Sequence, residues 1–309
     1  MLKSDTELYL QSLRVAKMSP HTTKTYRQAL EALMQFVGPE VDAREIDVNV
    51  MRAYVHVMAA KGLSASTRNH SLRVFKAFGK FLVDEGTLDE SVFHLILHAK
   101  SPVRLINPPT VEEVTRLLDG EIPTNWPARD RSELEILYGT GARVQEVVSI
   151  TLDDLRTDGT ILIHGKGDKE RLVPVGKPLE RALAEYLPER ARVLRRRNQH
   201  SRVLFFRCHA PSCTSNPWFA KLSAEPEPID VRTIRRVLRT VCQAKGLKPM
   251  NPHSLRHACA THMLNNGAPL VVIKELLGHA TVSTTARYAF VSIGLMQKTY
   301  RAAHPSCAA

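Results

Sequence analysis

Apolar residues recur with helical spacing through the first hundred residues. Between positions 65 and 83, Leu72, Phe75 and Phe78 fall three residues apart, which predicts an amphipathic helix with one buried face. Ser64 can cap this helix and Gly86 can end it. Runs of the same kind predict helices over residues 6–17, 20–37, 48–60, 65–83 and 90–98.

The pattern changes after a proline-rich stretch. Residues 101–109 hold three prolines, which is typical of a linker between domains. Thr110-x-x-Glu113 then has the spacing of a capping box, which marks the start of a new helix. We therefore predict a helical domain over residues 1–98, a linker over 99–109 and a second domain over 110–309.

The second domain combines helices with a small β-sheet. Two apolar strands, 160–164 and 171–175, flank Gly165-Lys166-Gly167-Asp168, a turn sequence that predicts a hairpin. We also expect a short strand at 203–206 and a loop over the Pro- and Ser-rich residues 208–228. Helices are predicted over 131–138, 143–150, 178–186, 189–197, 231–245, 252–266 and 270–277. The expected fold class is mainly α with a small sheet.

Charge favours an anionic partner. The 309 residues hold 43 Lys and Arg against 31 Asp and Glu, a net charge of +12, which suits nucleic acid. Two helical stretches present cations on one face, with a solvated surface as the alternative reading. These candidate DNA contacts are Lys61, Arg68, Arg73, Lys76 and Lys80 in the first domain and Arg232, Arg235, Arg236 and Arg239 in the second.

Cysteine usage and hydropathy point to the cytoplasm. The five cysteines are odd in number and form no regular framework, which argues for a reducing compartment. The chain lacks a signal-type apolar core at its start and any apolar run of the ~20 residues that a membrane span needs. We expect a cytoplasmic protein without a membrane partner.

Candidate chemistry is concentrated between residues 251 and 288. His253 and Arg256 lie three apart just inside a predicted helix start, where the helix dipole favours an anion. His279 follows a glycine stop, and Tyr288 comes one short segment later. Arginine and histidine suit a phosphate, and a tyrosine hydroxyl suits attack on it. The combination suggests covalent chemistry on a phosphodiester.

Metal sites fit less well. His253-x-x-x-His257 lacks the glutamate that a metalloprotease needs after its first histidine, because Ser254 stands there. Cys208, His209 and Cys213 have no second pair at zinc-finger spacing. Asp153-Asp154 follows a predicted helix end and is taken as a turn signal. We expect no metal ion and no other cofactor.

These motifs resemble those of the tyrosine recombinases, also called phage integrases. The resemblance rests on HSLRHACATHML, on LLGH, on a tyrosine nine residues after His279, on the GARVQE stretch at 141–146 and on GKGDKERLVPV at 165–175. It covers nearly the whole chain and is closest to the Xer recombinases, which resolve chromosome dimers. It implies a helical, SAM-like core-binding domain followed by a mixed α/β catalytic domain.

The resemblance also implies a role for each residue of the site. Tyr288 would be the nucleophile that forms a 3′-phosphotyrosyl intermediate. Arg143 and Arg256 would hold the scissile phosphate, with Glu146 supporting them from behind. Lys166 would protonate the leaving 5′-oxygen, although spacing alone leaves Lys169 as a rival. His253 would assist proton transfer from the tyrosine, and His279 would hydrogen-bond the phosphate.

The expected function is site-specific DNA recombination without metal or ATP. Its substrate would be double-stranded DNA that carries a specific site, and the family works as a homo- or hetero-tetramer on DNA. The sequence leaves open the DNA site, the need for a second recombinase or an activating protein, and the role of the 208–228 loop. It also leaves open whether the apolar tail (Ile293, Leu295, Met296 and Tyr300) docks on a neighbour or on its own domain. The alternatives are an integrase or transposase of a mobile element, and a DNA-binding protein without catalysis.

Overall fold

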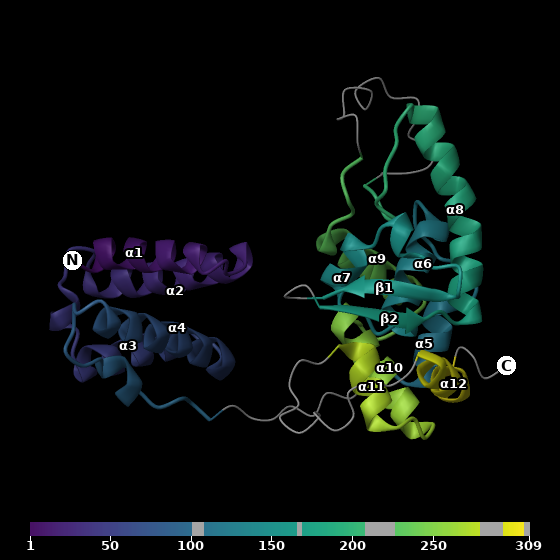
Figure 1. Cartoon of the computed structure of the whole chain (residues 1–309). Coiled ribbons are helices and arrows are strands. Elements are labelled where there is room, and N and C mark those ends of the chain that lie inside the picture. Colours follow the sequence, from purple (N-terminus) through teal and green to yellow (C-terminus); the bar gives the residue numbers. More distant parts are fainter. Residues whose placement is uncertain (101–107, 166–168, 208–225, 279–292, 306–309) are drawn as a thin grey trace. The chain divides into compact units, whose positions relative to one another are not determined.

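The computed structural model describes residues 1–100, 108–165, 169–207, 226–278 and 293–305 (Figure 1). Within the last range, the side chains of residues 293–296 and 298 are not described. The chain divides into two compact units, Met1–Leu105 and Ile106–Ala309, and this division falls inside the predicted 99–109 linker.

The first unit is entirely helical in its described part. Its helices are α1 (Leu2–Val15), α2 (Pro20–Val37), α3 (Val48–Ala60) and α4 (Ala65–Asp84), with 3₁₀ turns at Ala43–Glu45 and Val92–Leu95. Side-chain caps begin three of them, because Ser19, Asp47 and Ser64 each accept a hydrogen bond from a backbone N–H in the first turn. Phe75 and Phe78 of α4 are fully buried in the core, as their spacing predicts.

The end of this unit differs from the expected helix over 90–98. Only the single 3₁₀ turn forms there, after which Ile96 is extended and buried. Asn69 of α4 then exchanges two hydrogen bonds with the backbone of Ala99, each of 2.8 Å. Burial of Ile96 and these side-chain bonds hold the segment in an extended form, and a continued helix would lose both.

The second unit surrounds α6 with the other elements. The elements are α5 (Val111–Leu118), α6 (Pro127–Gly139), α7 (Val144–Ser149), a 3₁₀ turn (Leu152–Asp154), β1 (Thr160–His164), β2 (Glu170–Pro174), α8 (Lys177–Arg197), α9 (Val231–Ala244), α10 (Pro252–Asn265), α11 (Leu270–Leu277) and α12 (Ile293–Ala303). The predicted capping box at Thr110 is present. The two strands pair antiparallel with Ile161 opposite Val173, which confirms the predicted hairpin.

Two predictions in this unit were wrong. Residues 177–197 form one helix, not two, although Pro188 lies inside it. Buried residues on both sides of the proline, including Tyr186 and Val193, keep the helix continuous against the core, so packing outweighs the hydrogen bond that proline removes. Residues 203–206 form isolated bridges from Val203 to Thr151 and from Phe206 to Pro228, not a strand.

The fold class is as predicted, mainly α with a small two-stranded sheet. Within the described residues, none of the helices combines the length and the apolar character that crossing a membrane requires.

Candidate active site

Arg256 is held rigidly at the start of α10. Asn251 caps this helix by accepting a hydrogen bond from the Ser254 N–H, as its sequence predicts. The guanidinium of Arg256, only 5% exposed, donates to the carbonyl oxygens of Gly141 at 2.6 Å and Leu277 at 2.7 Å. Burial and the nearby Arg143 lower the pKa of Arg256 to about 10, so it remains charged at neutral pH. This cation is therefore fixed between two loops that are far apart in sequence.

Arg143 is the second cation and is more open. It precedes α7, and its Nη1 lies 2.7 Å from Oε1 of Glu146 while its backbone N–H donates to Oε2 at 2.8 Å. Its Nη2 lies 3.5 Å from the carbonyl oxygen of Gly278. The side chain keeps 45% of its surface exposed, so its guanidinium can still meet a ligand. Glu146 orients Arg143 without covering it.

Arg171 of β2 joins Arg143, Arg256 and Glu146 in one charged cluster, the arginine network. The sequence reasoning missed Arg171. Its Nη2 donates to Oε2 of Glu146 at 2.6 Å, and its Nε donates to the carbonyl of Leu276 at 2.8 Å. Burial raises the pKa of Glu146, but the bonds from Arg171 and Arg143 outweigh it, so the net shift is downward. The signal was the single arginine of the hairpin motif, directly after Glu170. Its partner lies 25 residues away, which spacing does not reveal.

Two glycines permit the close approach of these segments. Gly141 and Gly278 have φ of +60° and +64°, where other residues are strained. A Cβ on Gly141 would lie 2.6 Å from Cδ2 of Leu277, and one on Gly278 would lie 3.1 Å from Arg171. Side chains at either position would push apart the loops that carry the arginine network.

His253 lies on the same side of α10 as Arg256. Its Nε2 is 3.0 Å from Nε2 of His257, so one ring donates to the other. Burial, His257 and the cations Arg256 and Arg143 all lower the pKa of His253. A neutral imidazole at neutral pH can accept a proton, which is what a general base requires.

Three predicted site residues lie outside the described part of the chain: Lys166, His279 and Tyr288. Residues next to two of them lie at the network. Gly165 donates its N–H to the carbonyl of Lys169 at 2.7 Å, and a Cβ placed on it would be 3.7 Å from Oε1 of Glu146. The Gly278 carbonyl lies 3.5 Å from Nη2 of Arg143, and a Cβ placed on Gly278 would lie 3.1 Å from Arg171. The side chain of Lys169, the rival of Lys166, is exposed.

The turn end of the hairpin carries a charged cluster of its own. His164 lies 2.9 Å from Oδ1 of Asp154 and 3.0 Å from Oε1 of Glu170, and the bond to Asp154 raises its pKa. Asp154 also accepts hydrogen bonds from the backbone and hydroxyl of Thr151, both of 2.8 Å. The turn predicted at Asp153-Asp154 is therefore present, and Asp154 ties it to β1.

The arrangement suits a singly charged anion that gains charge during reaction. Arg143 lies close enough to Arg256 to lower the pKa of Arg256, and both arginines also lower the pKa of His253. Two guanidinium groups and an imidazole with a lowered pKa thus lie near one another, and they offer several donors and one proton acceptor. Among the described residues, no group of three or more His, Cys, Asp or Glu is placed to hold a metal ion.

The candidate DNA-contact residues lie on exposed faces. Arg73 and Lys80 of α4 are exposed, Lys61 follows the end of α3, and Arg68 and Lys76 are half-buried. On α9, the side opposite the buried Ile234, Leu238 and Val241 carries four exposed arginines: Arg232, Arg235, Arg236 and Arg239. Both helices therefore present cations to solvent.

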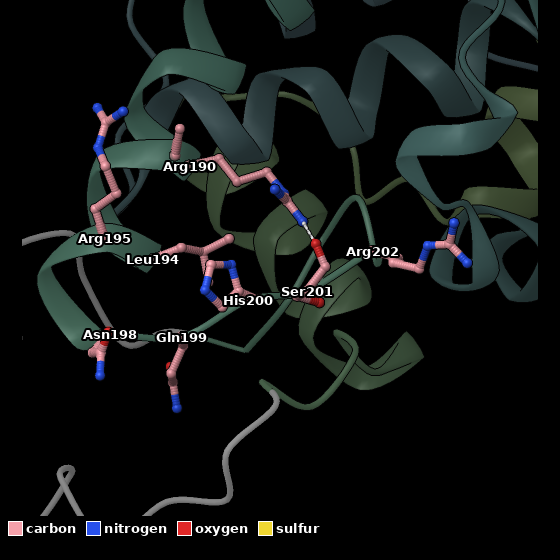
Figure 2. Close-up of a pocket in the computed structure, with 9 residues that line it drawn as sticks. Arg190, Leu194, Arg195, Asn198, Gln199, His200, Ser201 and Arg202 are labelled. Atoms are coloured by element: carbon pink, nitrogen blue, oxygen red, sulfur yellow. Dashed lines mark hydrogen bonds between the residues drawn. The ribbon is translucent and has the colours of Figure 1, made fainter.

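A separate groove of about 710 Å³ lies at the end of α8 (Figure 2). Its buried Arg190 donates to the carbonyls of Ser201, Val203 and Leu204, so this cation serves the fold. The groove is rimmed by the exposed Arg195 and Arg202. Residues of the arginine network are absent from its lining, so it is distinct from the candidate active site.

Known proteins resemble this chain along most of its length. The phage integrase family profile matches residues 110–293, and the profile of the phage integrase N-terminal SAM-like domain matches residues 6–86. The chain is 34% identical to tyrosine recombinase XerC of Listeria monocytogenes serotype 4b (strain F2365) over 304 residues, which cover 96% of this chain and 95% of that protein.

Solved structures share the fold. A lambda integrase (75-356) dimer bound to a COC′ core site superposes with a TM-score of 0.68 at 17% identity, covering 94% of this chain and 98% of that one. A lambda integrase tetramer bound to a Holliday junction gives 0.66 at 17% identity, covering 94% and 80%.

Proposed function

The chain belongs to the phage integrase family and is a tyrosine-type site-specific recombinase of the Xer type, and we propose that it cuts and rejoins DNA through a phosphotyrosyl intermediate on Tyr288. The single observation that carries this mechanism is the arginine network. Arg143 and Arg256 are fixed by Glu146 and by backbone carbonyls, and His253 lies beside them.

In the proposed reaction, the Tyr288 hydroxyl oxygen attacks the scissile phosphorus and loses its proton to His253. The bond from phosphorus to the 5′-oxygen breaks, and Lys166 gives that oxygen a proton. The 3′-phosphate is then esterified to the tyrosine, and attack by a 5′-hydroxyl reverses the steps. Because the ester bond is conserved in the intermediate, the reaction needs no nucleotide hydrolysis.

The arginine pair would supply most of the stabilisation. Charge grows on the non-bridging oxygens as the nucleophile approaches, and donors already fixed in place stabilise it without reorganising. A free tyrosine has a pKa of about 10, so a base and a positive surrounding are both needed at neutral pH. His279 would add a further donor to the same phosphate.

We propose that the DNA substrate binds to the exposed cations of α4 and α9. Phosphate contacts from these helices would give affinity, and a few base contacts would select the site. Lambda integrase is seen as a tetramer on a Holliday junction, and a tetramer is proposed here because strand exchange joins two duplexes. The match to XerC covers nearly the full length of both proteins. It favours a role in chromosome dimer resolution in the cytoplasm rather than a role in a mobile element.

A nicked suicide duplex tests the nucleophile. The nick lets the short 5′-hydroxyl strand diffuse away after cleavage, so the covalent adduct accumulates and is counted on a denaturing gel. Because its site is unknown, the DNA is first selected for binding from a random pool. We expect wild type to form the adduct and Tyr288→Phe to form none, with unchanged DNA affinity.

Tyr26→Phe in the first unit is the matched control, and it should react like wild type. An adduct with Tyr288→Phe would overturn the nucleophile assignment. Absence of any adduct with wild type on its selected site would favour a DNA-binding protein without catalysis.

A further inference from the structure

The end of α12 is anchored in the catalytic unit by a buried tyrosine. Tyr300 is 1% exposed, and its hydroxyl donates to the carbonyl oxygen of Gly139 at 2.6 Å. Gly139 is the last residue of α6, where carbonyl groups lack helical partners. A buried carbonyl of this kind needs a donor from elsewhere, and Tyr300 supplies it.

Neighbouring contacts fix the position of this tyrosine. His304 is fully buried, and its ring lies 4.8 Å from each of the rings of Tyr300 and Tyr138. Asn266, at the end of α10, donates to the carbonyl of Ala303 at 2.6 Å. These contacts therefore fix the position of the last turn of α12 against α6 and α10.

The carbonyl that Tyr300 holds begins the turn that carries the arginine network. After Gly139, the Thr140 hydroxyl accepts the N–H of Ala142 at 3.2 Å. The Gly141 carbonyl then receives Arg256, and Arg143 follows within two residues. Leu277 lies only 2.6 Å from the place where a Cβ of Gly141 would stand, which leaves the turn little room to absorb a shift in the chain before it. A displacement at Gly139 would thus move the acceptor of Arg256 and the backbone of Arg143 together.

We propose that Tyr300 is a positioning residue for the reaction: its hydroxyl on the Gly139 carbonyl sets the turn that aligns Arg143 and Arg256 on the phosphate. The inference rests on the proposed function. A misplacement of about 1 Å at reacting groups can reduce a rate about a hundredfold. Because Tyr300 is buried and makes no contact with DNA in the proposed reaction, its loss should slow cleavage and leave DNA binding unchanged.

Tyr300→Phe removes the hydroxyl and keeps the ring. The matched control is Tyr186→Phe in the same unit, since the Tyr186 side chain is fully buried and its hydroxyl also donates to a carbonyl, that of Leu204, at 2.9 Å. We expect both variants to lower the unfolding midpoint, because each loses a buried hydrogen bond. On the suicide duplex under single-turnover conditions, only Tyr300→Phe should slow adduct formation, by about ten- to a hundredfold, with an unchanged Kd.

A methylphosphonate at the scissile position gives a readout that a purely structural role would not move. Replacing a non-bridging oxygen with methyl removes the charge that the arginines meet, so their alignment matters less. The deficit of Tyr300→Phe relative to wild type should shrink to about threefold or less on this substrate, as expected when two changes act through one interaction.

Two outcomes would overturn the proposal: equal cleavage rates for Tyr300→Phe and Tyr186→Phe, or a deficit that is the same on phosphate and methylphosphonate. If Tyr300→Phe fails to fold, Asn266→Ala can be used instead, because it removes the hydrogen bond to the Ala303 carbonyl that holds the last turn of α12. Asn266→Ala should show a smaller loss of cleavage rate with the same dependence on the substrate. Failure of wild type to cleave would count against the proposed function instead, so the two failures are distinguishable.

Discussion

Glu146 is the residue through which the candidate active site is organised. Its two carboxylate oxygens meet Arg143 on one side and Arg171 on the other, and the backbone N–H of Arg143 adds a third bond. It is buried, whereas Arg143 is half exposed. One acid therefore holds two cations, and the cation it leaves accessible is the one proposed to meet the phosphate.

Replacing Glu146 with glutamine should destabilise the protein and slow cleavage. The amide keeps the shape but leaves Arg171 buried without its counter-charge, which typically costs about 3 kcal/mol. The folded-state pKa of Glu146 is lowered from its ordinary 4.5. Its stabilisation is thus present above pH 4.5 and is lost as pH falls through the lowered folded-state pKa.

Urea unfolding across a series of acidic pH values measures this difference. The gap between wild type and Glu146→Gln should be largest above pH 5 and should narrow as the pH falls below about 4. Glu275→Gln, an exposed acid on the neighbouring α11, is the control and should match wild type throughout. A gap that stays constant with pH would show that the charge of Glu146 is not what stabilises the fold.

Sequence reasoning reached some of these residues and missed others for a physical reason. Arg143, Glu146 and His253 lie in short motifs whose chemistry is visible in one dimension, and the structure brings them together. Arg171 was missed, and Tyr300 was named only as part of the apolar tail. These two residues donate to carbonyl groups 105 and 161 residues away, respectively. Every residue has a backbone carbonyl, so the sequence does not show which carbonyl will accept the hydrogen bond.

At the scale of elements, local signals predicted boundaries well where caps or turns set them. The strand at 160–164, the helix at 270–277 and the capped starts of α2, α4 and α10 form as expected. The failures occur where packing outweighs a local signal, as at Pro188 inside α8. Propensity describes the isolated chain, and a long buried face can outweigh one lost hydrogen bond.

The hairpin at the candidate site should depend on pH through His164. The bond from His164 to Asp154 raises the pKa of this histidine, with Glu170 adding to the effect. Its stabilisation is therefore full below about pH 6.5 and is lost as pH rises through the raised folded-state value. Because His164 and Glu170 are partly exposed, solvent screening limits the effect to less than about 1 kcal/mol.

Replacement with glutamine tests this, since His164→Gln can still donate a hydrogen bond but does not titrate. Wild type should be the more stable protein at pH 6 by urea unfolding, and the two should converge above pH 8. His200→Gln, an exposed histidine at the α8 groove, should follow wild type. A difference that grows at alkaline pH would have the wrong sign and would contradict the assignment.

At the scale of the whole molecule, the two units have separate cores. The core around Phe75 and the core around Trp126 share no residue, and each lies within one unit. Each unit also carries its own exposed cations, on α4 and on α9. Two independent surfaces joined by one chain can hold one ligand more tightly than either alone, because the second contact becomes intramolecular.

The salt dependence of DNA binding can show whether both surfaces meet the same duplex. The slope of log K against log salt is negative, and each phosphate contact that is lost reduces the magnitude of this slope by about 1. Two double variants test the two helices: Arg73→Gln with Lys76→Gln on α4, and Arg235→Gln with Arg236→Gln on α9. Each should reduce the magnitude of the slope by about 2 if both cations contact phosphates. The quadruple variant should then lose about 4, because each lost phosphate contact makes its own contribution to the salt dependence.

The matched control is Arg195→Gln with Arg196→Gln at the end of α8, which removes the same charge from an exposed surface that we do not assign to DNA. If the slope reported only the net charge of +12, this pair would lower it as much as the other two. If the slope instead reports phosphate contacts made by α4 and α9, the control pair should leave the slope unchanged. A quadruple variant no weaker than the α9 pair would instead place α4 away from the DNA and leave binding to the catalytic unit alone.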